Sequence, residues 1–206
     1  MALDLIIPEF SYKSIRQIAD SFLSKHHPER SLPVPIEQIA EIQFGLNIIP
    51  VPGLQKAFDV DAFISRDLAS VTVDQFILER RPNRYRFSLA HELGHLELHR
   101  DVFKQLEFSS VEDWKKLQQS IGESDYGWLE WQAYAFAGLT LVPPSELAKI
   151  FAELKGRASE VGLDLQKTGE VGLAYVSNEL AARFGVSKEV IERRLTKDGL
   201  WKIQPE

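Results

Sequence analysis

The stretch His91-Glu92-Leu93-Gly94-His95 carries two histidines four residues apart, with a glutamate between them. On an α-helix, residues i and i+4 project from nearly the same face, so both imidazole rings can reach one metal ion. Glu92 lies about 100° around the helix from His91, where its carboxylate can take a proton from a water held by that ion without being a ligand itself. The stretch therefore predicts a helix with a metal centre on one face.

This spacing is the H-E-x-x-H signature of zinc metallopeptidases. The competing interpretation is an exposed helix that carries two histidines and binds no metal. Catalytic zinc usually has three protein ligands and an open position for water, so the signature requires a third ligand from elsewhere in the chain.

Two known solutions for the third ligand fail in this sequence. A metzincin would have a glycine and then a histidine at the positions that Leu98 and Asp101 occupy, and the inverted H-x-x-E-H order is absent. A carboxylate from a later segment remains. The candidate acids are Glu97, Glu107, Glu123, Asp125 and Glu130.

Glu130 stands out because the predicted helix Leu129–Leu141 is apolar on almost every side. Such a helix is normally buried. A buried carboxylate without a partner is costly, and a bound cation removes that cost. The alternative is that Glu130 lies exposed near the start of the helix, where only the helix dipole favours it.

The composition is that of a soluble globular protein, with 206 residues, 44% hydrophobic and 26% charged. The net charge of −6 does not suit a molecule built to attract phosphate backbones. The absence of cysteine excludes disulfides, cysteine nucleophiles and thiolate metal sites, and it fits a reducing cytosol. Met1–Pro8 does not resemble a signal peptide, and the longest apolar run, Ala133–Val142, is too short to span a bilayer. We therefore expect a cytoplasmic protein without a membrane partner.

The hydrophobic periodicity predicts an α+β fold: a mostly helical, zincin-like metallopeptidase core with a small β-sheet, plus a C-terminal helix-turn-helix-like module. We expect a zincin-like domain over residues 1–154, a linker over 155–170 and the helical module over 171–206. Asn83 is the expected N-cap of the metal helix, which should run to about Arg100. The other expected elements are helices over 12–25, from 36 to Gly45 and over 145–154, and strands Leu46–Val51, Asp61–Ser65 and Ser70–Asp74, the last extending in one alternative into Phe76–Leu78.

Near the C-terminus, Glu179–Leu195 has the pattern of two helices joined by a glycine-containing turn, as in a helix-turn-helix. Residues 177–206 hold six Lys/Arg and five Asp/Glu, and Glu189 and Glu192 fall inside the second helix. Phosphate contacts dominate non-specific DNA affinity, so this surface is poor for DNA. We expect a packing or partner-docking role and no DNA binding.

Two motifs resemble the ImmA/IrrE family of metallopeptidases. The segment from Arg84 through the H-E-x-x-H stretch to Leu98-His99 resembles the family core, and Glu130-Trp131-Gln132-Ala133 onward to Leu141-Val142-Pro143 resembles its second motif. With the similar upstream segment Pro33–Ala40, the resemblance covers roughly residues 12–150. It implies that Glu130 is the third zinc ligand. Tyr134 departs from the pattern, because many members carry Asn or Asp there.

The motif and the resemblance together predict a zinc-dependent endopeptidase with a gluzincin-like ligand set. His91, His95 and Glu130 would hold Zn²⁺, although Mn²⁺ or Co²⁺ also suits these ligands, and Glu92 would be the general base. The donor for the oxyanion stays open among His99, Tyr126 and Tyr134. Family members commonly act on helix-turn-helix repressors, so the expected partner is a protein substrate: a repressor or antitoxin of a mobile element, toxin–antitoxin or stress system. The alternatives are a DNA-binding or antitoxin-like regulator with a structural metal site, and a metalloenzyme of another hydrolytic type.

Overall fold

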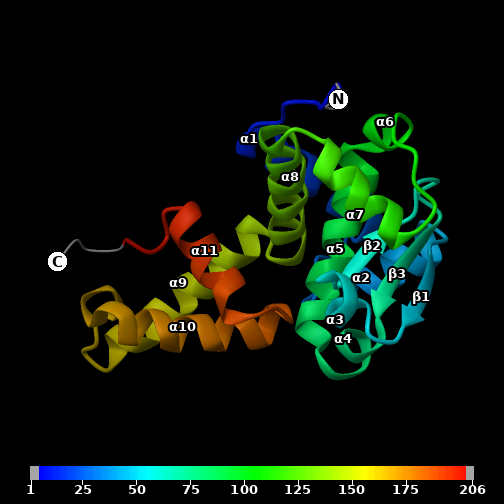
Figure 1. Ribbon diagram of the computed structural model, residues 1–206. Helices are drawn as coiled ribbons and strands as arrows, with labels where there is room; N and C mark the ends of the chain where they lie inside the picture. The colour runs from blue at the N-terminus through cyan, green and yellow to red at the C-terminus, as the bar shows by residue number, and fades with distance from the viewer. Residues whose placement is uncertain (1–4, 203–206) are drawn as a thin grey trace.

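The computed structural model describes residues 5–202, in which a small three-stranded sheet lies at one edge of a mostly helical molecule (Figure 1). Residues 1–4 and 203–206 lie outside the described part. The start of the Met1–Pro8 run and the outer ends of the first and last predicted domains therefore also lie outside it. The elements are α1 (Tyr12–His26), α2 (Ile36–Gln38), the π-helical turn η1 (Ile39–Gln43), β1 (Asn47–Val51), α3 (Leu54–Phe58), β2 (Ala62–Ile64), β3 (Ser70–Asp74), α4 (Gln75–Arg80), α5 (Pro82–Leu98), α6 (Arg100–Phe103), α7 (Val111–Ser120), α8 (Glu123–Leu141), α9 (Pro144–Glu160), the 3₁₀ turn η2 (Leu165–Thr168), α10 (Gly169–Phe184) and α11 (Lys188–Lys197).

The sheet has the strand order β1-β3-β2, with β1 parallel and β2 antiparallel to the central strand β3. Val71 and Val73 of β3 are fully buried, which follows from the alternation of apolar residues along a strand that is covered on one face. β2 forms one edge of the sheet and lies beside α5. The mostly helical α+β class expected from the sequence is confirmed in this coarse form.

The alternative extension of the third strand into Phe76–Leu78 is wrong, because these residues belong to α4. The Asp74 carboxylate accepts a hydrogen bond of 3.0 Å from the backbone N–H of Ile77. Asp74 thereby satisfies one of the free N–H groups at the start of the helix and ends the strand.

α5, which carries the H-E-x-x-H stretch, begins at Pro82, and its N-cap is Arg81 rather than Asn83. Proline suits the first helical position, since its fixed φ is already helical and the N–H that it lacks would have no partner there. The Asn83 side chain instead donates to the backbone carbonyl of Val186 at 3.0 Å. α5 also ends at Leu98, two residues before the predicted end, and His99 links it to α6.

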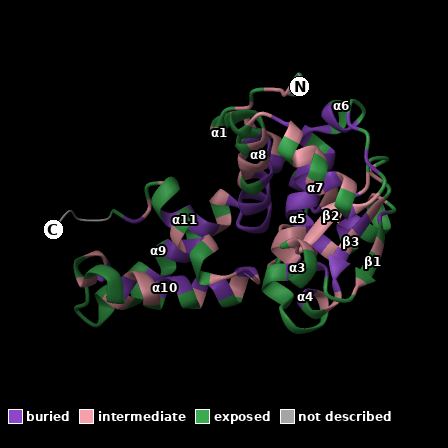
Figure 2. Ribbon diagram, viewed as in Figure 1, coloured by how far each residue is buried: buried purple, intermediate pink, exposed green. Residues whose placement is uncertain are grey.

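α5 and α8 pack against each other, and buried residues fill most of α5 and the C-terminal half of α8 (Figure 2). Gly94 allows the two helices to approach closely: a Cβ atom there would lie 3.1 Å from both Cα and the carbonyl oxygen of Ala133. Leu93 of α5 and Phe136 of α8 are fully buried. Because α8 begins at Glu123, six residues before the predicted start, Glu130 lies well inside the helix and the exposed position considered for it is excluded.

The C-terminal helices α9, α10 and α11 extend to one side of the molecule (Figure 1). α9 continues to Glu160, through the first residues of the segment predicted as a linker, so the division into domains stays a prediction. Arg194 of α11 is buried and donates to the carbonyl of Gly138, at 2.5 Å, and to that of Val142. These bonds anchor α11 to the end of α8. Among the described residues no helix is both long and apolar enough to cross a membrane.

Candidate metal centre

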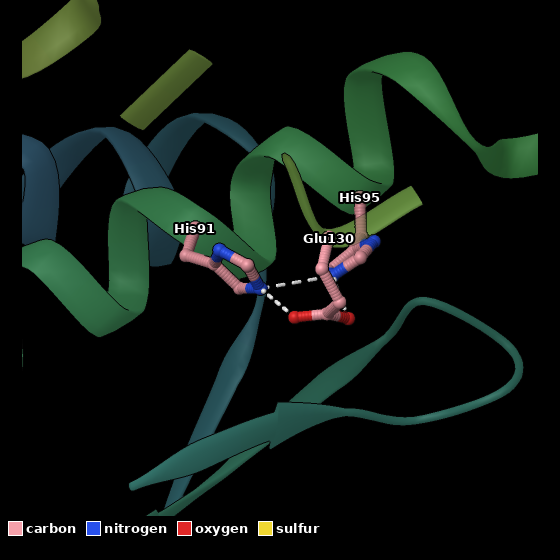
Figure 3. Close-up of side chains that lie close together, drawn as sticks. All are labelled: His91, His95 and Glu130. Atoms are coloured by element: carbon pink, nitrogen blue, oxygen red, sulfur yellow. Dashed lines mark hydrogen bonds and ion pairs between the residues drawn. The ribbon is translucent and has the colours of Figure 1, made fainter. Parts of the chain in front are cut away.

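Two neighbouring helices bring His91, His95 and Glu130 together (Figure 3). The Nε2 atoms of the two histidines on α5 lie 3.0 Å apart. From α8, the Glu130 carboxylate reaches both rings, with distances of 3.2 Å from Oε2 to His91 Nε2 and 3.4 Å from Oε1 to His95 Nε2. Within residues 5–202 no other group of three or more potential ligands converges in this way, so the remaining candidate acids lie outside the cluster.

The spacing of the three side chains fits a single zinc ion. Two ligand atoms about 2.0–2.1 Å from zinc and separated by a tetrahedral angle lie about 3.3 Å from each other. The separations of 3.0 Å between the two nitrogens, and of 3.2 and 3.4 Å from each nitrogen to the nearer Glu130 oxygen, bracket this value. The two rings also present their Nε2 atoms to each other. Without a cation, at most one proton can lie between these two nitrogens, whereas a metal ion can bind the lone pairs of both. The donor set of two imidazoles and one carboxylate suits zinc and related divalent ions.

The protonation of the metal-free cluster follows from burial and from the Glu130 charge. Burial opposes ionisation of Glu130, but hydrogen bonds to His91 and His95 outweigh it and hold the pKa of the carboxyl below its usual range. Burial also opposes the charged form of His91, yet its bond to Glu130 raises the pKa of this ring. Burial lowers the pKa of His95, and the neighbouring His91 contributes to this.

Glu92 is buried beside this cluster without belonging to it. Its Oε2 accepts a hydrogen bond of 2.9 Å from the backbone N–H of Ile64, in the edge strand β2. Burial raises the pKa of the Glu92 carboxyl to about 8. The contact with Ile64 could not be found from the sequence, because it joins residues 28 positions apart through the packing of β2 on α5.

His99 is a residue whose position the sequence did not reveal. It was considered as an oxyanion donor or a helix end, but it is fully buried, and its Nδ1 lies 3.0 Å from Nδ1 of His95. Burial lowers the pKa of His99 to about 2, so the ring is neutral. The spacing of four residues between His95 and His99 was the available signal, since such residues share a helix face.

A cleft of about 650 Å³ opens over the cluster. Of the three residues considered as oxyanion donors, Tyr126 and Tyr134 line it and His99 does not. The Tyr134 ring lies 4.5 Å from the His91 ring and is half exposed. The other lining residues include the β2 residues, the start of α5, part of α7 and three C-terminal residues: Ala62, Phe63, Ile64, Asn83, Arg84, Phe87, Ser88, Trp114, Lys115, Gln118, Ser187, Glu189 and Val190.

Two buried histidines and a partly buried glutamate form this cluster, a second glutamate lies at its side, and a cleft next to an edge strand opens onto it. This is the arrangement of a metallopeptidase site. The family model of IrrE N-terminal-like domains, peptidase family M78, matches residues 76–196, which is more than half of the chain. The chain belongs to this ImmA/IrrE family of metallopeptidases. The match includes both α5 and α8, and it continues to the last turn of α11. Among curated proteins, no sequence matches the chain.

Proposed function

We propose that the protein is a zinc-dependent endopeptidase in which His91, His95 and Glu130 hold the metal ion and Glu92 is the general base. The observation that carries the proposal is the convergence of two buried histidines and a partly buried glutamate at separations that suit one tetrahedral ion. A bound zinc ion would supply Lewis acidity, which acidifies a water molecule in its open position and polarises the carbonyl of the scissile peptide bond.

The residues of this chain then have separate tasks. Glu92 accepts a proton from the attacking water and returns it to the leaving amine. The Ile64 N–H group fixes one oxygen of the Glu92 carboxylate, which leaves the other oxygen free for this proton transfer. Tyr126 and Tyr134 line the cleft, and the hydroxyl group of either could donate a hydrogen bond to the oxyanion.

The edge strand β2 supports an extended peptide as substrate. Asp61 accepts a bond from Asp74 of β3, and Ser65 donates one to Ser70, so the pattern of an antiparallel pair turns the backbone groups of Ala62 and Ile64 away from β3. Both residues line the cleft. The Ile64 N–H group is already bonded to Glu92, so a substrate strand would pair with the outward-facing backbone groups of Ala62 and the carbonyl of Ile64, and would lie across the metal site as in β-strand addition.

We further propose that the substrate is a regulatory protein, namely a helix-turn-helix repressor or antitoxin, and that the enzyme acts in the cytoplasm. The support is the resemblance of the two motifs to the ImmA/IrrE pattern.

The contacts of the C-terminal helices favour a packing role over DNA binding, because Asn83 and Arg86 of α5 bind the α10–α11 turn through the carbonyls of Val186 and Gly185.

The test combines metal analysis with cleavage of a candidate repressor encoded next to this gene. The wild type, Glu92→Gln and the control Glu97→Gln are compared, because Glu97 lies on the same helix but is exposed. We expect about one zinc ion per chain in all three proteins, cleavage by the wild type and the control, and a loss of at least about 100-fold in rate for Glu92→Gln, since general-base catalysis contributes about 10²–10⁴-fold.

Equal cleavage by Glu92→Gln and the wild type would remove Glu92 from the mechanism. Absence of any retained divalent ion would contradict the metal site itself. A regulator with a structural metal would instead bind DNA in a gel mobility-shift assay. This binding would weaken steeply as the salt concentration rises and would be retained in Glu92→Gln.

A further inference from the structure

We infer that His99 is a positioning residue, which fixes the tautomer and orientation of His95 by accepting a hydrogen bond from its Nδ1–H group. The inference rests on the proposed role of His95 as a metal ligand. It concerns a residue that is fully buried, touches no part of the cleft and is therefore outside the catalytic machinery.

The direction of the hydrogen bond follows from the geometry of His95. Its Nε2 faces His91 and Glu130, so this atom is the one that ligates the metal. A neutral imidazole that uses Nε2 as a ligand carries its proton on Nδ1. The Nδ1 atom of His99 lies 3.0 Å away and is buried with it, so it must be the acceptor.

The same reasoning fixes the tautomer of His99. Since its Nδ1 accepts, its proton is on Nε2. This Nε2 is buried and has no hydrogen-bond partner within the distance and angle limits of an ordinary bond. The buried Gln132 side chain lies next to it, and its Oε1 already accepts from the backbone N–H of Phe10 at 3.3 Å. A carbonyl oxygen has two lone pairs, so a small rotation of Gln132 lets Oε1 accept from His99 as well.

The two histidine ligands differ in this respect. The Nδ1 atom of His91 is buried and has no hydrogen-bond partner among the described residues, and the ring packs against Tyr134. His95 alone of the pair thus has a side chain behind it that holds the ring in its ligating orientation. Metal-ligating histidines generally use such a partner, and removal of the partner typically costs about 10–100-fold in metal affinity.

The experiment compares two substitutions of His99 that differ in one property. In His99→Asn the amide oxygen branches from Cγ, as Nδ1 does in histidine, so it can accept from His95. His99→Leu has a similar volume and no acceptor. His27→Leu is the matched control, because His27 is also buried but lies away from the metal ligands. Among the described residues its Nε2 contacts the backbone carbonyl and the hydroxyl of Ser31, and its Nδ1 contacts the Glu29 carboxylate.

Three properties are measured on the full-length chain: zinc affinity by competition with a chromophoric chelator, the visible absorption spectrum with Co²⁺ in place of zinc, and the melting temperature without metal. We expect His99→Leu to bind zinc about 10–100-fold more weakly than the wild type and to show altered Co²⁺ bands. His99→Asn should stay within about threefold of the wild type and keep its bands, and His27→Leu should change only the melting temperature.

Equal zinc affinity of His99→Leu and the wild type would overturn the inference. So would equal losses in His99→Asn and His99→Leu, because a merely structural histidine is not rescued by an acceptor alone. If the wild type itself binds no zinc, the proposed metal site fails and this inference fails with it. If the wild type binds zinc but His99→Leu binds it equally well, the inference alone fails.

Discussion

Replacement of Glu92 by glutamine should stabilise the zinc-free protein at alkaline pH, although it should abolish catalysis. Burial raises the pKa of the Glu92 carboxyl to about 8, from an ordinary value near 4.5. The folded state therefore binds a proton that the unfolded chain releases at lower pH. Stability from this group is fully present below about pH 4.5 and is lost as the pH rises through about 8.

The magnitude follows from the width of this window. Each pH unit in which the folded state holds one more proton than the unfolded chain lowers the free energy of unfolding by about 1.4 kcal/mol. Between pH 5.5 and 8.5 the wild type should lose about 3 kcal/mol through Glu92, and Glu92→Gln should not. The glutamine side-chain oxygen can still accept the hydrogen bond from Ile64, so the fold is retained.

The assay is urea denaturation of both proteins after removal of metal with a chelator, at several pH values between 5.5 and 8.5. The difference in unfolding free energy between variant and wild type should grow by about 3 kcal/mol across this range. Zinc should reduce the difference, because a bound cation favours the ionised carboxylate. A difference that stays constant with pH would show that Glu92 is not protonated in the folded protein, and the reasoning from burial would be refuted.

Three further predictions concern other parts of the structure. Glu130→Ala removes one of three protein ligands and should weaken zinc binding by about 100-fold or more, measured by chelator competition; an unchanged affinity would exclude Glu130 as a ligand. Gly94→Ala places a methyl group 3.1 Å from the backbone of Ala133. The steric overlap should cost about 1–3 kcal/mol of stability, which outweighs the gain of about 1 kcal/mol in helix propensity, and the resulting shift of α8 should lower zinc affinity. A variant that is more stable than the wild type and has full zinc affinity would contradict this. Arg194→Met leaves two carbonyls without their donor and removes the cation from the Asp198 carboxylate, which keeps the hydrogen bond from Tyr12. It should cost about 3–5 kcal/mol in urea denaturation, whereas the exposed neighbour Arg193→Met should change stability little; equal effects would contradict the anchoring role.

Much of the metal site could be predicted because the information is local. The spacing of His91 and His95 fixes their common helix face, and the apolar surroundings of Glu130 marked a carboxylate that needs a cation. The strands Asn47–Val51 and Ser70–Asp74 were likewise predictable from their apolar pattern and the turns that flank them.

The remaining features depend on contacts between distant parts of the chain. Asn83 has the usual chemistry of an N-cap, but its side chain binds Val186, which only the packed C-terminal turn brings within reach. The Phe76–Leu78 segment was ambiguous by pattern, and the Asp74 side chain decided it in favour of a helix. The bond from Ile64 to Glu92 requires the sheet to be in place, and no periodicity encodes it.

The rim of the cleft has a composite origin. Ser187, Glu189 and Val190 contribute to it, although the ligand cluster itself comes entirely from α5 and α8. If the proposed endopeptidase takes its substrate into this cleft, the residues that hydrolyse the peptide and part of the surface that contacts the target lie in different segments of the sequence. Exchange of the α10–α11 hairpin between relatives would then transfer one protein's preference to another while its hydrolytic machinery is inherited unaltered.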